Sequence, residues 1–310
     1  MKIVTSCQTP DLDGVACMYA YSELLNIQGE EANYFINGEP RTEVHIVCEK
    51  FNIELNGIKA EDISDLSEFV LVDCNGLGYL YSKIKPNNIV EVIDHHSLSD
   101  SLASYTHIQR CQIDRIGATA TIVTERFKNS RITPSRESAI LLFYAIISNS
   151  INLKATITKQ RDIDACKWLE CLYDDITYER IKEIFEEKSK INEMDLRSEM
   201  ECEFPLVLDK FKVIVGQLEI ANLETFIKKN KEKIIEILKK VKNEKKLDYA
   251  FINCVDILYG YVIIISADDE SQNFVEKTFG YIFDEKNIAK INKIVQRKEM
   301  TAIIRQKYKN

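Results

Sequence analysis

The sequence predicts an α/β protein whose N-terminal domain has a doubly wound, mostly parallel sheet, followed by a smaller α/β C-terminal domain. Short β-branched runs alternate with helical patterns through the first 170 or so residues, which is typical of a parallel sheet with crossover helices. A highly charged stretch then separates this part from a second α/β pattern. A length of 310 residues also suits two domains better than one core.

In the N-terminal part, the predicted strands are short apolar runs, and two of them end in an aspartate. The expected strands are Lys2–Thr5, Glu68–Asp73 and Ile89–Asp94. A polar loop over 6–13 follows the first strand. The expected helices cover 14–25, 117–127, 136–147 and 162–172.

The charged segment 181–203 is interpreted as a solvated amphipathic helix, and this also suits an inter-domain connection. We therefore place the first domain at 1–187, a linker at 188–200 and the second domain at 201–310. In the second domain the pattern predicts strands at 212–219, 249–253, 261–266 and 301–305, with helices at 223–242 and 273–279.

Composition narrows the function classes. A net charge of −8 argues against general nucleic-acid binding and against an anionic membrane surface, since both need a basic excess. The sequence contains no run of about 18 apolar residues, so no membrane span is expected. Nine scattered cysteines without a CxxC pair, and a start that resembles a strand more than a signal peptide, indicate a reducing, cytoplasmic location.

Acidic and imidazole side chains follow three predicted strands. Asp11 and Asp13 follow the first, Asp73 ends the second, and Asp94-His95-His96 ends the third. In an open parallel sheet, side chains just past the carboxyl ends of the strands converge on one crevice. So many carboxylates would repel each other without cations, and oxygen ligands with imidazole suit Mn²⁺ or a similar metal.

Each piece has a structural alternative. The segment Asp11-Leu12-Asp13-Gly14 alone is more often a turn, and a strand-terminal aspartate such as Asp73 often caps the next helix. Adjacent histidines after an apolar strand have little structural use, so the ordered set favours a metal site.

Other landmarks are more ordinary. Gly117–Thr121 opens a helix whose amides could face a phosphate, or its small residues could simply pack on the sheet. His45 and His107 are expected to be structural, and Trp168 is expected in a core.

The chain resembles the DHH superfamily, and in particular the manganese-dependent family II inorganic pyrophosphatases. The segments PDLDG, VLVDCN, EVIDHHS, GATATIVTERF and AIISNSINLK carry the resemblance in order, and QLE, VDIL and QRKE extend it into the second domain. It covers nearly the whole chain. It implies an active site in the cleft between the two domains, with the second closing over the first to exclude water.

The resemblance also implies two divalent ions, with Mn²⁺ favoured and Mg²⁺, Co²⁺ or Zn²⁺ as alternatives, in a two-metal site about 3.5–4 Å across. By this resemblance Asp11 and Asp73 bind one ion, and Asp13, Asp73 and His95 bind the other. His96 and Asp94 are the catalytic candidates. His96 faces the substrate phosphate, which Arg297 and Lys298 of the second domain also bind.

Two expected metal ligands are altered. Cys7 stands where the family has a histidine, and Asn149 where it has an aspartate; a basic residue of the family falls loosely at Cys202. Cys7 could be a thiolate ligand that favours softer metals, or a protonated, buried cysteine. Asn149 offers an amide oxygen without charge, so weaker binding of the second metal is expected.

The leading hypothesis is hydrolysis of inorganic pyrophosphate or a short polyphosphate by metal-activated water. The alternatives are a phosphodiesterase or nucleotidase with a larger substrate, suggested by Cys202, and a non-catalytic phosphate or nucleotide binder, suggested by Cys7 and Asn149. The expected partner is a small phosphate compound, and a homodimer is possible.

Overall fold

The computed structural model describes residues 1–76, 78, 80–103, 108, 110–190, 196–200, 205–285 and 287–308. By its internal contacts the chain divides into two units, one of residues 1–153 and 157–184 and the other of residues 154–156 and 185–310. The sequence analysis places the first boundary a few residues later and assigns a linker to 188–200.

The first unit is built on a five-stranded sheet in the order β2-β1-β3-β4-β5, and every pair of neighbours is parallel. Its strands are β1 (Lys2–Thr5), β2 (Ala32–Phe35), β3 (Glu68–Val72), β4 (Ile89–Asp94) and β5 (Arg110–Ile113). The strand order reverses beside β1, because the chain turns outward to β2 and then crosses to β3. Ligand crevices of open α/β sheets form at such a reversal, outside the carboxyl ends of the strands.

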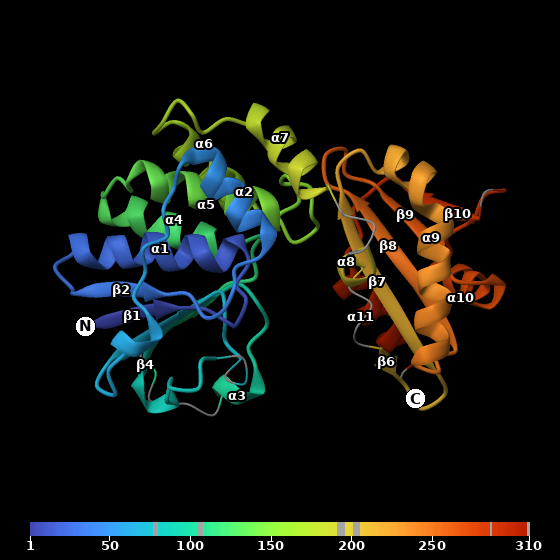
Figure 1. Cartoon of the computed structure of the whole chain (residues 1–310), viewed down its shortest axis with the longest axis horizontal. Helices are drawn as coiled ribbons and strands as arrows, with labels where there is room; N and C mark the ends of the chain where they lie inside the picture. Colours follow the sequence, from blue (N-terminus) through green and yellow to red (C-terminus); the bar gives the residue numbers. More distant parts are fainter. Residues whose placement is uncertain are drawn as a thin grey trace. The chain divides into compact units, whose positions relative to one another are not determined.

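Helices complete the first unit, and Figure 1 shows α1, α4 and α5 together on one side of the sheet. The helices are α1 (Leu12–Ile27), α2 (Thr42–Phe51), α3 (Asp100–Ala103), α4 (Thr119–Ser130), α5 (Arg136–Asn149), α6 (Gln160–Glu170) and α7 (Glu179–Lys188), which crosses the boundary between the units; short 3₁₀ turns are η1 (Ala60–Asp62) and η3 (Pro86–Asn88). In α5 every residue from Ser138 to Ile147 is buried, which is typical of a helix enclosed on all sides.

The second unit has a mixed sheet in the order β10-β9-β8-β7-β6, in which only β7 and β8 pair in parallel. Its strands are β6 (Leu206–Val207), β7 (Lys212–Ile220), β8 (Tyr249–Asp256), β9 (Val262–Ser266) and β10 (Ile288–Ile291). Its helices are α8 (Leu196–Glu199), α9 (Leu223–Glu244), α10 (Asp269–Phe279) and α11 (Arg297–Tyr308). The predicted α/β class is therefore confirmed for both parts.

One predicted element is wrong. The segment 301–305 is not a strand but part of α11. Its apolar run resembles a strand, yet the side chains that α11 buries are Met300 and Ile304, four residues apart, which is the spacing of one helix face. Ile303 is exposed instead.

The charged segment after 181 contains α7 and α8, with residues 191–195 and 201–204, Cys202 among them, outside the described part. Ile181, Ile184 and Phe185 of α7 are buried, so this helix has the expected apolar face. Trp168 on α6 is only half-buried. In the described part of the chain, no helix combines the length and apolar character that crossing a bilayer requires.

Candidate metal centre

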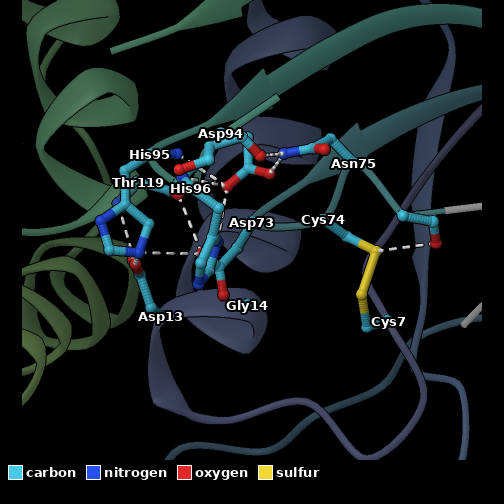
Figure 2. A network of polar contacts seen from close by, with 12 residues as sticks. Cys7, Asp13, Gly14, Asp73, Cys74, Asn75, Asp94, His95, His96 and Thr119 are labelled. Atoms are coloured by element: carbon cyan, nitrogen blue, oxygen red, sulfur yellow. Dashed lines mark hydrogen bonds and ion pairs between the residues drawn. A yellow bond between two sulfur atoms is a disulfide. The ribbon is translucent and has the colours of Figure 1, made fainter. Parts of the chain in front are cut away.

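The carboxyl ends of β1, β3 and β4 bring the predicted acidic and imidazole side chains together (Figure 2). Asp73 follows β3 directly and has a left-handed backbone with φ of 52°, which is uncommon for a residue other than glycine. The ring nitrogens of His95 and His96 and a carboxylate oxygen of Asp73 lie within 4.8 Å of one another. This cluster is the candidate metal centre.

His95 is oriented by the backbone. Its Nδ1 lies 2.9 Å from the carbonyl oxygen of Ile116, and because a carbonyl only accepts, Nδ1 carries the proton. The lone pair is then on Nε2, which lies 3.6 Å from Asp73 Oδ1 and 3.9 Å from Asp13 Oδ2. A histidine held by one nitrogen, with the other facing carboxylates, is the usual arrangement of a metal ligand.

Asp13 is fully buried at the N-terminus of α4. The amide of Thr119 donates to its Oδ2 and the amide of Ala120 to its Oδ1, each at 2.8 Å. The sequence suggested that these helix amides could face a phosphate, but they bind Asp13 instead. Burial, and then the nearby charge of Asp11, raise the pKa of Asp13 to about 7 despite these two hydrogen bonds.

Asp73 is held in a similar setting. The hydroxyl of Thr119 donates to its Oδ1 at 3.0 Å, and its side chain is 7% exposed. Burial, followed by the charges of Asp13, Asp11 and Asp94, raises the pKa of Asp73 well above its ordinary value. Without a cation, these carboxylates therefore favour protonated forms.

Asp11 caps α1. Its carboxylate accepts from the amides of Asp13 and Gly14, each at 3.1 Å. The sequence favoured a turn for this segment and helix capping for Asp73, so the capping role of Asp11 was not predicted. The charge of Asp11 still reaches the acidic groups beside His95, because it raises the pKa of both Asp13 and Asp73.

His96 is oriented by Asp94, which is completely buried. Burial alone would raise the pKa of Asp94, but hydrogen bonds from the His96 side chain and backbone and from Asn75, with the charge of His96, lower it. An ionised Asp94 only accepts, so His96 Nδ1, 2.9 Å away, donates to it. The side chain of His96 is 42% exposed, so a ligand can reach it from outside.

Asn149 acts as a donor. Its Nδ2 lies 2.8 Å from Asp13 Oδ2 and 3.4 Å from His95 Nε2. An amide next to Asp13 adds no negative charge, and the weaker second metal position stays a prediction.

The sequence left two alternatives for Cys7, a metal-binding thiolate or a protonated, buried thiol, and both are wrong. Cys7 forms a disulfide with Cys74, so it is neither a thiolate ligand nor a protonated thiol (Figure 2). The physical reason is strand order: β1 and β3 are parallel neighbours, with Thr5 paired to Leu71, so residues just past their ends lie close. The Cα atoms of Cys7 and Cys74 are 5.6 Å apart.

Sequence reasoning missed three supporting residues. Asn75 donates to Asp94 and accepts from the Ser99 amide at 2.7 Å. Thr119 contacts both Asp13 and Asp73, as described above. Asp162, also buried, accepts from the amide of Gly117 at 3.0 Å and the hydroxyl of Thr121 at 2.6 Å. The sequence did contain signals for two of them: Asn75 lies two residues past the predicted strand end at Asp73, within VLVDCN, and Thr119 lies within the helix start Gly117–Thr121.

The remaining predicted residues lie elsewhere. His45 is outside the cluster, with its Nε2 3.0 Å from Glu39, and His107 is outside the described residues. Arg297 and Lys298 begin α11 in the second unit, where the Arg297 amide donates to Gln217 Oε1 at 2.7 Å. Whether they approach the candidate metal centre stays a prediction.

Comparisons with known proteins agree with this description. Residues 2–146 match the family described as "DHH family, N-terminal domain". The chain is 27% identical over 301 residues to the manganese-dependent inorganic pyrophosphatase of Bacillus subtilis, covering 94% of this chain and 93% of the relative. It is 28% identical, with the same coverage, to a Bacillus velezensis protein named "Probable manganese-dependent inorganic pyrophosphatase".

Among solved structures, the chain is similar to a candidate family II inorganic pyrophosphatase from Methanococcus jannaschii. The TM-score is 0.70 at 19% identity, and the match covers 100% of both chains. At this identity the likeness shows the fold alone.

Proposed function

Because this chain carries the N-terminal domain of the DHH family and resembles manganese-dependent inorganic pyrophosphatases along almost its whole length, we propose that it hydrolyses inorganic pyrophosphate with divalent metal ions. Short polyphosphate is the second substrate we propose. Mn²⁺ is the favoured metal, and two ions per chain are proposed.

The observation that carries the proposal is the set of donors around His95 Nε2. The lone pair on His95 Nε2 faces the carboxylates of Asp73 and Asp13. Burial disfavours the charged forms of both carboxylates. This donor set fits a first-row divalent cation, which would neutralise the carboxylates. Asp73 and Asp11 are the proposed ligands of the first ion, and Asp73, Asp13 and His95 those of the second, with Asn149 as a neutral neighbour.

A bound pair of divalent cations supplies a nucleophile from water near neutral pH and neutralises charge on the phosphoryl group. The protein's own residues then position the reactants. The α4 amides fix Asp13, and the Ile116 carbonyl fixes His95. Asp94 fixes His96 so that its Nε2 can bind a phosphate oxygen or hold a proton for the leaving group.

We propose that Arg297 and Lys298 bind the phosphate from the second unit. The Gln217 contact holds the first turn of α11, on which both side chains begin. Arg supplies a bidentate fork and Lys a point charge, so the two are not interchangeable.

The test is a substrate panel of pyrophosphate, tripolyphosphate, a cyclic dinucleotide and p-nitrophenyl phosphate, each with Mn²⁺, Co²⁺, Mg²⁺ or Zn²⁺. We expect pyrophosphate with Mn²⁺ to be hydrolysed fastest. Asp73→Asn should reduce kcat by at least about a thousandfold, because the carboxylate proposed as a ligand of both ions would lose its charge. Asp164→Asn, which changes an exposed carboxylate on α6, serves as the control. Absence of phosphate release with every metal would overturn the proposal.

The role of the second unit is tested separately. Arg297→Ala should raise KM for pyrophosphate about tenfold or more through loss of charge-assisted hydrogen bonds, while Mn²⁺ binding is unchanged. Lys293→Ala, which removes another exposed cation of the second unit, should leave KM unaltered. Equal effects of the two variants would argue against a specific phosphate contact at Arg297.

A further inference from the structure

The disulfide between Cys7 and Cys74 joins the two loops that carry metal-ligand candidates. Cys7 lies in the loop after β1, four residues before Asp11, and Cys74 directly follows Asp73. The covalent link therefore connects the backbone of Asp73 to the loop of Asp11. Within the described residues the other cysteines form no disulfide; they are Cys17, Cys48, Cys111, Cys166, Cys171 and Cys254.

The two cysteine residues differ in exposure. Cys74 is 2% exposed, whereas Cys7, in the loop after β1, is partly exposed. We therefore expect an incoming thiol to attack at Cys7 rather than at Cys74. Because exchange requires direct attack on a sulfur atom, this asymmetry defines which sulfur is attacked and which one leaves.

We propose that Cys7–Cys74 is a reversible thiol–disulfide site that reacts with small or protein dithiols, and that its oxidised form pre-positions Asp11 and Asp73 for the cation. The proposal rests on the metal centre proposed above. Asp73 has a left-handed backbone, which a non-glycine residue adopts at an energetic cost, and the adjacent disulfide restrains it. Reduction of the disulfide increases the conformational freedom of both loops, and binding of a cation must then order them again.

The exchange is balanced in electrons and atoms. One sulfur of the dithiol attacks Cys7 Sγ, the Cys7–Cys74 bond breaks, and Cys74 leaves and takes a proton. The second sulfur of the dithiol then attacks the mixed disulfide, and Cys7 leaves as a thiol. The dithiol is oxidised to a disulfide by two electrons, and the protein pair is reduced by the same two electrons to two thiols.

The experiment compares Mn²⁺ binding to the oxidised and reduced full-length protein. Dithiothreitol reduces one sample, desalting without oxygen removes the reagent, and alkylation with mass spectrometry confirms two additional thiols at Cys7 and Cys74. Electron paramagnetic resonance of free Mn²⁺ then gives the dissociation constant. We expect the reduced protein to bind Mn²⁺ about tenfold more weakly, since ordering a single backbone residue changes an equilibrium by roughly this factor.

Two variants separate this effect from general reduction. The Cys7→Ser, Cys74→Ser double variant should bind like the reduced protein and should not respond to dithiothreitol. Cys171→Ser, which changes an exposed cysteine outside the pair, should keep the full response. If the double variant does not fold, the comparison of the two wild-type forms still decides.

The outcomes distinguish this inference from the proposed function. Equal or tighter Mn²⁺ binding after reduction, with both thiols confirmed, would overturn the inference while leaving the metal centre intact. Failure of the oxidised protein to bind Mn²⁺ at all would overturn the metal centre, and the inference with it.

Discussion

The buried carboxylates of the candidate metal centre predict an unusual dependence of stability on pH when metal is removed. The pKa of Asp13 is raised from 3.8 to about 7, and that of Asp73 is raised as well, with burial as the main cause of both. A carboxyl group with a raised pKa in the folded state binds its proton more tightly there than in the unfolded chain. Its contribution to stability is complete below about pH 4 and is lost as the pH rises towards 7.

The magnitude follows from the pKa of Asp13. Each pH unit between the unfolded and folded pKa values changes stability by about 1.4 kcal/mol per group. From pH 5 to about pH 7 this gives a loss of roughly 3 kcal/mol for Asp13, and Asp73 acts in the same direction. We therefore expect the chelated protein to be less stable at pH 8 than at pH 5, by about 3 kcal/mol.

The chain offers a convenient probe. Trp168 is the only tryptophan and lies half-buried on α6 in the first unit, so its fluorescence follows unfolding of the part that holds the candidate metal centre. Urea titrations at pH 5, 6, 7 and 8 would be recorded with chelator and again with excess Mn²⁺. A cation takes the place of the proton, so the loss at high pH should disappear when Mn²⁺ is present.

The matched control is Asp13→Asn, which cannot titrate at this position and should reduce the pH dependence in chelator, with Asp73 accounting for the part that remains. A chelated wild-type protein that is equally stable or more stable at pH 8 than at pH 5 would refute the electrostatic argument. So would an Asp13→Asn variant with the same slope as the wild type.

Two further substitutions have defined outcomes. Gly117→Ala should lower the urea midpoint by the equivalent of about 1–3 kcal/mol, because the added Cβ would meet the Asp162 carboxylate at 2.9 Å; an unchanged midpoint would contradict the close packing. Asn149→Asp should destabilise the chelated protein at pH 8, since a second carboxylate would face Asp13, and should tighten Mn²⁺ binding about tenfold in calorimetry. Weaker Mn²⁺ binding by this variant would contradict the placement of Asn149 beside the cation.

The sequence predicts the strands that carry the candidate metal centre, because the spacing of apolar residues and the order of strands and helices can be read directly along the chain. The strands ending at Asp73 and Asp94 are apolar, β-branched runs, and parallel strands place their carboxyl ends on one edge. This is enough to bring Asp13, Asp73 and His95 near one another. Secondary structure in the second unit was harder to predict. The apolar run around Ile304 in α11 is too short for its periodicity to distinguish a strand from a helix.

The missed features depend on which strands are neighbours. Cys7 and Cys74 are 67 residues apart in sequence, and only the adjacency of β1 and β3 brings them within bonding reach. The α4 amides that bind Asp13 likewise depend on how α4 is placed against α1, which no local pattern encodes. A resemblance that assigns a role by position, as it does for Cys7, fails where this chain uses the position differently.

The presence of asparagine at position 149, where the resemblance implies an aspartate, has a physical consequence. Asp13 and Asp73 already lie beside His95, and burial makes their charges costly when no cation is bound. Another carboxylate at Asn149 would increase that cost, whereas the amide donates a hydrogen bond to Asp13 at 2.8 Å. We therefore expect the fold to depend less on metal, and the same missing charge to weaken attraction for the cation. Restraint of the Asp73 loop by the Cys7–Cys74 disulfide acts in the opposite direction, because ligands that are already ordered bind a cation at lower entropic cost.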